Sequence, residues 1–357
     1  MAKETIIVGA GLSGLSAALA LADRGRKVRV LEAEKSVGGT ASYVDSTYLD
    51  PAAVSASLGV DISPALSPWG LTRAWVYGRK HEFHQPAKVG AYTVERGRGK
   101  NSLEKILYRA AKEAGVPVEL GVRLSPEKLK ALPAGSIVAT GLDRESFAAM
   151  GVPSRPFYCH MATGKGAPGR PDVIIYIDET TREFGYYFQA GEKAGALVFD
   201  VKKPLTVQAV ESFKNKLEQN DGIAFSTWSD RLAKTASWPL GAFLNRRLFS
   251  GDKILAGTIS GMVSPVLVFG VAGALVSGRI AALAVDDPAL ASRRFRRMAP
   301  LYVPQMAFRK LRERAPHALL KPLTRAMVKT YHPRVFPWLM LFAAWPPGLG
   351  REDYGQP

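Results

Sequence analysis

Cysteine is almost absent from this chain of 357 residues, in which Cys159 is the single example. One cysteine excludes an intramolecular disulfide and makes a cysteine-based metal cluster implausible. Histidine is also scarce, and the one close pair, His81 and His84, lacks a companion acid in a helical context, so these residues are expected at the surface rather than as ligands. We predict no metal site, and the scarcity of thiols fits a reducing cytoplasm.

Long hydrophobic runs are missing as well. The longest strongly apolar stretches fall short of the roughly 18 residues that a transmembrane helix needs. The opening stretch "MAKETIIVGAGLSG" has no basic region leading into an apolar segment and a cleavage site, so we expect no secretory signal. The G-x-S-x-G elbow and the P-loop are absent too. We therefore expect a soluble or surface-bound cytoplasmic protein that is neither a serine hydrolase of that type nor a P-loop enzyme.

The chain is long enough for a large core. Hydrophobic residues make up 47% of it and charged residues 22%, which is typical of a globular protein. Because 357 residues exceed the size at which one core usually stops growing, two closely packed domains are favoured.

The front of the chain reads as a strand, a turn, a helix and a second strand. Residues 6–8 form a short buried strand, the helix runs to about Arg24, and residues 28–31 form the second strand, which ends at Glu32. The turn carries the spacing G-x-G-x-x-G. The first glycine permits a tight turn, the second lets a pyrophosphate approach the backbone, and the third lets the helix pack on the strand. The free N–H groups of the helix N-terminus face the phosphates. The predicted nucleotide-binding residues here are Gly9, Gly11, Leu12, Ser13 and Gly14, with Glu32 and Ala33 on the ribose side. The alternative, a glycine-rich turn in an unrelated α/β protein, leaves the acid at position 32 unexplained.

Further along, three stretches carry a resemblance: "GGT" at 38–40, "SIVATGLD" at 136–143, and "KILAGTISGMVSPVLVFGVAGALVSGRIAALA" at 253–284. With them the sequence resembles the FAD-binding flavoproteins, which include amine oxidases, phytoene desaturases, aromatic hydroxylases and geranylgeranyl reductases. The third stretch is similar to the family's C-terminal flavin motif, with Thr258 in the place of the usual aspartate. The resemblance implies FAD as the cofactor and these additional binding residues: Gly39, Thr40, Ala139, Thr140, Gly141, Gly257, Thr258, Pro265, Gly270 and Val271.

The segment "SLEKILYRAAKEAGVPVELG", residues 102–121, reads as an amphipathic helix followed by a strand. It resembles the helix and adenine-side strand that, in the hydroxylase and reductase branch, follow an arginine contacting the cofactor. That resemblance adds Val122 to the binding residues. Both Arg96 and Arg98 are candidates for this arginine, and spacing does not choose between them. We include Arg98 among the predicted cofactor-binding residues.

From about residue 150 to 238 the pattern changes to alternating strands, "PDVIIYIDE" and "EFGYYFQAGEKAGALVFDV". A period of two with β-branched and aromatic residues predicts an antiparallel sheet. The cluster at 186–188 and the run from Trp238 resemble segments of geranylgeranyl reductases, which implies that Tyr186, Phe188 and Trp238 shape a lipophilic pocket. Tyr176 and Tyr186 are the candidate proton-relaying residues. For any one of these aromatics the alternative is an ordinary sheet core.

The net charge of +17 is concentrated near the end of the chain. Residues 293–334 hold twelve Lys or Arg against one acid, Glu313, and the apolar, aromatic stretch "VFPWLMLFAAWPPG" follows. Basic residues beside Trp and Phe suit the surface of an anionic membrane, which we expect residues 293–345 to contact. The alternative is a solvated basic helix followed by a segment that packs on the protein itself or on another subunit. Nucleic acid is not favoured because no recognition motif accompanies the charge.

These observations predict an α/β protein with a Rossmann-like FAD-binding domain (1–149 and 239–288), an inserted antiparallel β-sheet substrate domain (150–238) and a basic, helical C-terminal segment (289–357). The resemblance implies an FAD-dependent oxidoreductase that reduces double bonds of a prenyl or other lipophilic substrate. A monooxygenase or desaturase on the same fold is an alternative, and a non-catalytic FAD-binding partner docked on a membrane is another. Because no second G-x-G-x-x-G leads into a predicted helix, as a nicotinamide site requires, electrons are expected from docked NAD(P)H, ferredoxin or another carrier.

Overall fold

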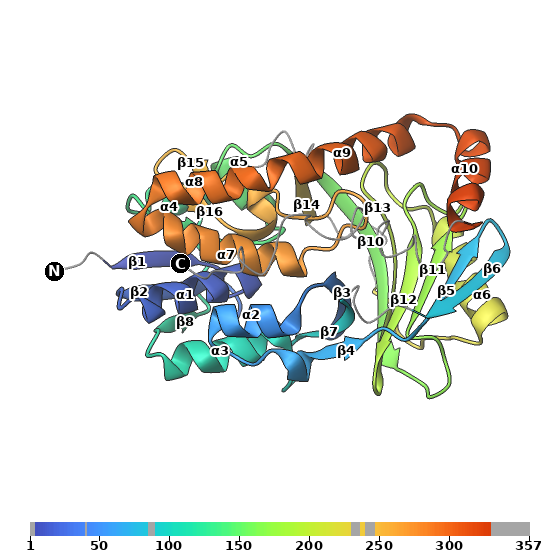
Figure 1. Ribbon diagram of the computed structural model, residues 1–357, viewed down its shortest axis with the longest axis horizontal. Coiled ribbons are helices and arrows are strands. Elements are labelled where there is room, and N and C mark those ends of the chain that lie inside the picture. Colours follow the sequence, from blue (N-terminus) through green and yellow to red (C-terminus); the bar gives the residue numbers. More distant parts are fainter. Residues whose placement is uncertain (1–3, 40, 85–89, 230–235, 240–246, 330–357) are drawn as a thin grey trace.

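The computed structural model describes residues 4–39, 41–84, 90–229, 236–239 and 247–329. Three sheets organise them. A six-stranded sheet covered by helices on both faces lies at one end of the molecule, and a seven-stranded sheet lies at the other (Figure 1). A three-stranded sheet lies between these two, and a line of C-terminal helices runs along one edge (Figure 1). This mixed α/β architecture confirms the predicted fold class.

The six-stranded sheet has the order β15-β16-β9-β1-β2-β8 and is parallel except for the β15–β16 hairpin. Its central strands are short and apolar on both faces. Ile7 and Ile137 belong to the core on one face, whereas Val8 and Val138 belong to the core on the other. Both faces must therefore be covered by helices. The strands are β1 (Thr5–Val8), β2 (Val28–Glu32), β8 (Val118–Leu120), β9 (Ile137–Val138), β15 (Phe249–Ser250) and β16 (Lys253–Leu255).

Helix α1 (Leu12–Asp23) lies at the centre of the first face and packs against α7 (Val271–Asp286) and α3 (Leu103–Glu113). Gly278 of α7 lets the two helices approach closely, since a Cβ there would lie 2.3 Å from the carbonyl oxygen of Ser13. The other face packs against α4 (Pro126–Lys130) and α5 (Arg144–Ala149) through Leu129 and Phe147.

The three-stranded antiparallel sheet has the order β3-β7-β4. Its alternating residues point Val44 and Tyr48 toward the seven-stranded sheet, where both join a core that includes Phe188. Its elements are β3 (Ser42–Tyr48), α2 (Pro51–Leu58), the short 3-10 helix η1 (Ser63–Ala65), β4 (Leu66–Pro68) and β7 (Ala91–Gly97).

The seven-stranded sheet has the order β14-β10-β13-β12-β11-β5-β6. All of its pairs are antiparallel except β11 with β5. Helix α6 (Val207–Asp221) covers one face through Val210, Phe213 and Leu217, and the other face turns toward the three-stranded sheet. The strands are β5 (Leu71–Val76), β6 (Arg79–His84), β10 (Ser154–Lys165), β11 (Val173–Ile177), β12 (Gly185–Ala190), β13 (Lys193–Asp200) and β14 (Ala236–Pro239).

Strands β5 and β6 depart from the predicted division of the chain. Residues 71–84 were assigned to the FAD-binding domain, yet they complete the seven-stranded sheet, where β5 pairs with β11 from Val173↔Thr72 to Ile177↔Val76. The pattern within one strand does not reveal a partner about a hundred residues away, so the sequence could not place this pairing.

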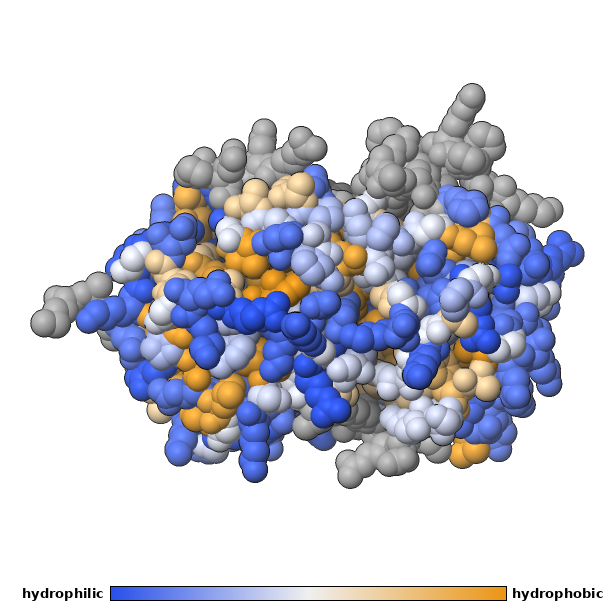
Figure 2. All heavy atoms as spheres, turned by 90° about the horizontal axis from the view of Figure 1, so that it is seen from below, coloured by the Kyte–Doolittle hydropathy of each residue, from blue (hydrophilic) through white to orange (hydrophobic). Residues whose placement is uncertain are grey.

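Helices α8 (Pro288–Arg297), α9 (Ala299–Arg314) and α10 (His317–Lys329) form the C-terminal segment. The first two run along one edge of the molecule, and α10 turns down beside the β5–β6 hairpin (Figure 1). None of the helices within the described ranges combines the length and apolar character required to cross a membrane. Viewed from below, the surface is largely hydrophilic with hydrophobic patches between (Figure 2).

Candidate functional site

The first glycine turn joins β1 to α1 at the carboxyl edge of the parallel sheet. Gly9 has a φ of 103°, and a Cβ there would lie 2.4 Å from the carbonyl oxygen of Ala139. A Cβ on Gly14 would lie 1.8 Å from the carbonyl oxygen of Gly9, so only glycine lets the helix pack this closely on the strand. Gly11 differs because a Cβ there would meet no protein atom within 4 Å. The backbone at Gly11 is thus open to a ligand.

The N-termini of α1 and α7 lack a capping side chain. Their N-cap residues are Gly11 and Gly270. The N-terminal N–H groups of a helix have no partner within the helix, and they carry the positive end of its dipole. Six other helices satisfy one of these groups with a capping side chain, namely Asp50, Ser102, Ser125, Asp143, Thr206 and Asp287. The two helices that the sequence assigned to the cofactor therefore offer their N–H groups to an anionic ligand.

Glu32 ends β2 and holds the first glycine turn. Its Oε2 accepts a hydrogen bond from the N–H of Ala10 at 2.6 Å, and its Oε1 accepts one from the N–H of Glu34 at 2.9 Å. Each carboxylate oxygen keeps a further lone pair for a ribose hydroxyl. The N–H of Val122 donates to the Glu32 carbonyl at 2.8 Å, so Glu32, Ala33 and Val122 lie together on the predicted adenosine side.

The second glycine turn contacts the end of β7. A Cβ on Gly38 would lie 2.1 Å from the carbonyl oxygen of Gly97, and the N–H of Arg98 donates to the carbonyl of Ala41 at 3.0 Å. A Cβ on Gly39 would likewise meet no protein atom within 4 Å, although its N–H and carbonyl already form hydrogen bonds with Ser36. This arrangement brings Gly39 and Arg98 to one place. Thr40, also predicted to bind the cofactor, lies outside the described residues.

Of the two candidate arginines, Arg96 forms ion pairs with neighbouring carboxylates, whereas the Arg98 side chain is exposed. Arg96 pairs with Glu104 at 2.7 Å and with Asp45 at 3.1 Å. Burial lowers the pKa of the Arg96 guanidinium, but these carboxylates outweigh it and the pKa is raised overall. Arg96 therefore fastens β7 to α3 and β3, and Arg98 is the one whose guanidinium is free to reach solvent or a ligand.

The ends of β9 and β16 lie beside the glycine turn. The N–H of Ala139 donates to the carbonyl of Val8 at 2.8 Å, and the N–H of Ala256 donates to the carbonyl of Val138 at 3.0 Å. Thr140 and Gly141 follow directly, and Thr140 Oγ1 is buried without a hydrogen-bond partner among the described residues. Gly257 has a φ of 75°, and a Cβ there would lie 2.6 Å from Ser13 Oγ. Thr258 is the one partly exposed residue of the 3-10 helix η3 (Gly257–Ser260).

The loop between η3 and α7 carries Pro265 and ends at Gly270, and Val271 begins the helix. Its Val268 has a φ of 65°, a left-handed conformation that a β-branched residue rarely adopts. Arg309 of α9, 2% exposed, donates to the carbonyl of Pro265 at 2.7 Å, and its guanidinium also pairs with Glu183 at 2.5 Å. A buried arginine thus ties the loop to the C-terminal helices and to the residues just before β12.

Aromatic side chains connect this loop to the seven-stranded sheet. The Tyr186 and Phe188 rings are 4.3 Å apart between centroids, and Phe188 lies 5.9 Å from Trp69 in a stacked arrangement. Phe269 of the loop stacks on Tyr48 at 5.9 Å and also contacts Phe188 and Trp69. Phe188 is buried, whereas Tyr186 and Phe269 are partly exposed. Burial raises the pKa of the Tyr186 phenol well above 10, so this hydroxyl stays protonated at neutral pH.

Sequence reasoning missed Tyr48, Trp69 and Phe269 as members of this aromatic cluster. Phe269 lies inside the predicted flavin motif, two residues before helix α7 begins, and the aromatic residue at that position was the available signal. The predicted pocket residue Trp238 belongs to β14, whose backbone pairs with β10; its side chain lies outside the described part of the chain.

Tyr176 is placed on the opposite face of the same sheet. It packs with Phe213 of α6, its hydroxyl donates to the carboxylate of Asp221, and burial is the largest cause of its raised pKa. Because neighbouring residues on a strand point to opposite faces, Ile175 lies on the side of the loop and Tyr176 does not. The structure therefore corrects the proposal that Tyr176 relays a proton to the cofactor.

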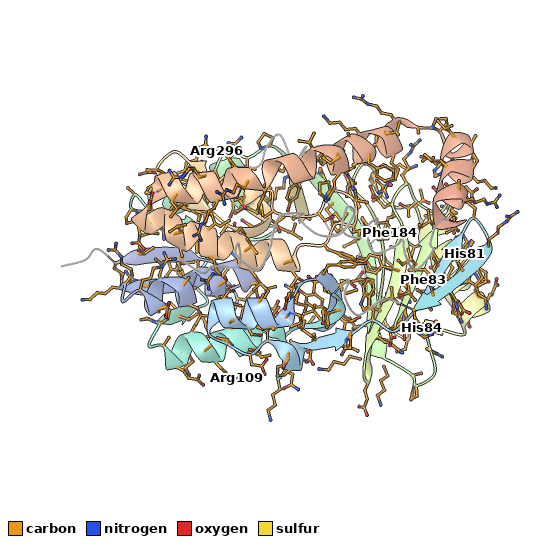
Figure 3. The ribbon with its side chains drawn as sticks, viewed as in Figure 1. His81, Phe83, His84, Arg109, Phe184 and Arg296 are labelled. Carbon is orange, nitrogen blue, oxygen red and sulfur yellow. The ribbon has the colours of Figure 1, made fainter. Side chains whose placement is uncertain are left out.

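His81 and His84 lie on β6 and, at a spacing of three on a strand, point to opposite faces (Figure 3). No group of three potential metal-ligating side chains occurs among the residues that the structure describes.

The assembled residues fit a dinucleotide with an attached ring system. The set comprises two helix N-termini without capping side chains, the space beside Gly11 and Gly39, the Thr140 hydroxyl without a partner among the described residues, and the Glu32 carboxylate. The pyrophosphate would face α1, the adenosine would face Glu32, and the ring system would face α7.

Comparison with known proteins agrees with this organisation. Residues 7–68 match the family of NAD(P)-binding Rossmann-like domains. A stretch of 37 residues is 62% identical to L-amino-acid oxidases of Echis ocellatus and Bothrops pauloensis. That stretch is 10% of this chain and spans only 7% of either oxidase, so the likeness is confined to a small part of each protein.

Solved structures extend the likeness over nearly the whole chain. A geranylgeranyl bacteriochlorophyll reductase-like protein from Thermoplasma acidophilum has a TM-score of 0.62 at 16% identity, covering 98% of this chain and 94% of that one. An HpxO variant from Klebsiella pneumoniae complexed with FAD has a TM-score of 0.66 at 14% identity, covering 97% and 100%. A p-nitrophenol 4-monooxygenase from Pseudomonas putida has a TM-score of 0.65 at 12% identity, covering 96% and 95%. At such low identity these matches establish the fold, which this chain shares with all three.

Proposed function

We propose that this protein is an FAD-dependent oxidoreductase that reduces double bonds in a prenyl or other lipophilic substrate. The observation that carries the proposal is the convergence of two helix N-termini without capping side chains, those of α1 and α7, on the carboxyl edge of the parallel sheet. A structural neighbour complexed with FAD supports FAD as the ligand. The residues that would hold it are those predicted from the sequence, from Gly9 and Glu32 to Gly270 and Val271.

Bound FAD would supply the hydride chemistry, and the chain would supply orientation, electrostatics and exclusion of water. The N–H groups at the start of α7, at Gly270 and Val271, would stabilise negative charge at the N1–C2=O edge of the ring. The protonated hydroxyl of Tyr186 would be a proton donor on the side of the sheet that faces the loop.

The aromatic cluster supports a lipophilic substrate. Tyr186 and Phe269 are partly exposed, and the ring of each contacts the ring of the buried Phe188. Such a surface favours contact with an unsaturated hydrocarbon chain. The likeness to a protein described as geranylgeranyl bacteriochlorophyll reductase-like agrees with this choice.

The absorption spectrum of the purified protein tests the cofactor. Peaks of oxidised flavin, restored after removal by adding FAD but not FMN, are expected. A colourless protein with no measurable affinity for FAD would overturn the proposal. The reaction is tested by photoreduction without oxygen followed by addition of a polyprenyl lipid, which should restore the oxidised flavin spectrum. A saturated lipid of equal length is the control.

A monooxygenase or desaturase is the second candidate, favoured by the likeness to a p-nitrophenol 4-monooxygenase. Mixing the protein with NADPH and candidate aromatic substrates in the presence of oxygen distinguishes a monooxygenase from a reductase. Oxygen consumption triggered by the substrate would count against a reductase. The third candidate, a non-catalytic FAD-binding partner, is motivated by Thr258; flavin that no unsaturated lipid reoxidises would favour it.

A further inference from the structure

The outward surface of α9 and α10 is unusual for a surface helix pair. Every exposed residue between positions 303 and 326 is apolar or cationic, with no acid and no neutral polar side chain among them. Among the largest are Leu311 and Leu319, which are 54% and 56% exposed. We call these residues the α9–α10 face: Val303, Pro304, Ala307, Lys310, Leu311, Arg314, Pro316, Ala318, Leu319, Pro322, Leu323 and Ala326.

Helix α6 gives the ordinary pattern for comparison. Its exposed residues beyond the first turn are Glu211, Asn215, Glu218, Gln219 and Asn220, as expected for a helix with one apolar face packed on a sheet. On α10, by contrast, Leu320 is buried against the protein while Leu319, Pro322, Leu323 and Ala326 repeat at helical spacing on the outer side. The helix thus carries a second apolar stripe that is exposed at the surface, in which Leu319 is 56% and Leu323 is 42% exposed.

Cations surround this stripe. A groove of about 360 Å³ between α10 and the β5–β6 hairpin is lined by Arg79, Lys321, Pro322, Arg325 and Ala326. Arg325 donates to the carbonyl of Tyr77 at 2.9 Å, which fixes its position, and its buried Nε has no hydrogen-bond partner among the described residues. Further along the same edge of the molecule, α8 exposes Arg293, Arg296 and Arg297 (Figures 1 and 3).

Charge decides which occupant fits. The single acid of α9 and α10, Glu313, is held by Arg155 and Arg309 and does not belong to the exposed face. A second copy of this chain would bring an equally cationic surface to this one, and the like charges would repel. An anionic bilayer matches both features, because it accepts apolar side chains at the level of its acyl chains and attracts Lys and Arg at its phosphates.

We propose that the α9–α10 face docks on an anionic phospholipid membrane, with its apolar side chains inserted at the interface and the surrounding Lys and Arg, including the groove at Arg79 and Lys321, contacting headgroup phosphates. Docking through this face would hold the molecule at the surface of the phase that contains lipophilic compounds. The proposal does not depend on the redox function, since it needs neither cofactor nor turnover.

Flotation of the full-length protein with vesicles tests the apolar part. The double variant Leu319→Glu and Leu323→Glu should bind vesicles of phosphatidylglycerol and phosphatidylcholine about tenfold or more weakly than the unmodified chain. Val207→Glu is the matched control, since Val207 is 55% exposed on α6. Thermal unfolding of each variant verifies that it is folded. Undiminished binding of the folded double variant would overturn the proposal and assign any membrane affinity to another part of the chain.

The electrostatic part is tested with the double variant Lys310→Gln and Arg314→Gln. It should bind the anionic vesicles several-fold more weakly and depend less on salt, whereas Lys128→Gln with Lys130→Gln on α4 should bind as the unmodified chain does. Vesicles of phosphatidylcholine alone should bind little of any variant. Equal binding to neutral and anionic vesicles would contradict the proposal. Inorganic phosphate added at constant ionic strength should not displace the protein; displacement would show that the groove takes free phosphate instead of a headgroup.

Discussion

Arg309 of α9 donates a hydrogen bond to the carbonyl of Pro265, in the loop that leads into α7, across a distance of 2.7 Å. The guanidinium is 2% exposed and also pairs with Glu183 and Glu313. Arg312 pairs with the same Glu183 carboxylate, and Arg155 of β10 pairs with Glu313. The C-terminal helices therefore hold the loop at the candidate cofactor site, although they are far from it in the sequence.

Replacing Arg309 with Met should destabilise the protein and weaken FAD binding. Breaking a buried ion pair typically costs about 3–5 kcal/mol, because the remaining carboxylate is left without its partner. Arg309→Lys should recover part of the stability but not the forked contact with Pro265 and Glu183. Urea unfolding and FAD titration measure the two effects. Arg296→Met on the exposed side of α8 (Figure 3) is the control, and unchanged FAD affinity in folded Arg309→Met would mean that the loop needs no support from α9.

Gly11 and Gly14 should respond differently to alanine. A methyl group at position 11 enters open space, so Gly11→Ala should leave the free energy of unfolding of the apoprotein within about 1 kcal/mol of its original value and weaken FAD binding at least about tenfold. A methyl group at position 14 would lie 1.8 Å from the carbonyl oxygen of Gly9, so Gly14→Ala should destabilise the apoprotein by about 1–3 kcal/mol or more. Titration with FAD and urea unfolding separate the two outcomes. Equal FAD affinity for Gly11→Ala and the unmodified chain would show that the pyrophosphate does not bind at this turn.

Thr258 stands where the resembled family has an aspartate. Thr258→Asp should tighten FAD binding roughly fivefold, because a charged acceptor contributes about 1 kcal/mol more than a neutral hydroxyl. Thr258→Asn keeps the shape without the charge and should not produce this gain. Fluorescence titration of the apoprotein measures all three affinities, and a weaker Thr258→Asp complex would show that this position does not face the ribityl chain.

The pKa of Glu313 predicts how stability depends on pH. Burial alone would raise this pKa, but hydrogen bonds and charges from Arg155 and Arg309 outweigh it, and the pKa lies below its ordinary value of 4.5. A carboxyl whose pKa is lower in the folded state stabilises that state fully above pH 4.5 and loses this contribution as the pH falls through the folded-state pKa. The fall in the free energy of unfolding between about pH 5 and about pH 3 should therefore be shallower in Glu313→Gln than in the unmodified chain. Identical slopes would place the acid sensitivity elsewhere, and Glu113→Gln on the exposed side of α3 is the control.

Local chemistry explains what the sequence predicted well. The G-x-G-x-x-G turn, the helix after it and the acid at Glu32 depend on contacts within about 30 residues, so their spacing alone indicates β1, α1 and β2. The alternation of residues from 171 to 201 likewise predicted β11, β12 and β13. Arg309 could not be recognised in this way, because its partners Pro265 and Glu183 lie 44 and 126 positions away. In the sequence Arg309 is one of twelve basic residues in residues 293–334, a pattern that predicts solvent-exposed side chains.

The aromatic cluster was predicted only in part, for a related reason. Tyr186 and Phe188 alternate within one strand and are visible as a pattern, whereas Trp69 and Tyr48 come from a neighbouring unit that the sequence assigned to another domain. Periodicity also predicts that residues 175 and 176 face opposite sides without saying which side faces the loop. Only the packing of α6 on Tyr176 decides this.

Substitution of Tyr176 and Tyr186, which lie on opposite faces of the seven-stranded sheet, tests which face the substrate approaches. Tyr176→Phe removes a buried hydrogen bond to Asp221 and should lower the free energy of unfolding by about 1–2 kcal/mol, while the rate at which a polyprenyl lipid reoxidises photoreduced FAD in the protein should not change. Tyr186→Phe should change stability by less than about 1 kcal/mol and slow that reoxidation about tenfold or more, since the variant loses a proton donor on the side of the loop. Urea unfolding and stopped-flow absorbance measure the two quantities on the same samples. If Tyr176→Phe slowed reoxidation and Tyr186→Phe did not, the substrate would have to approach from the α6 side, and the aromatic cluster at Phe188 and Phe269 would be a structural core.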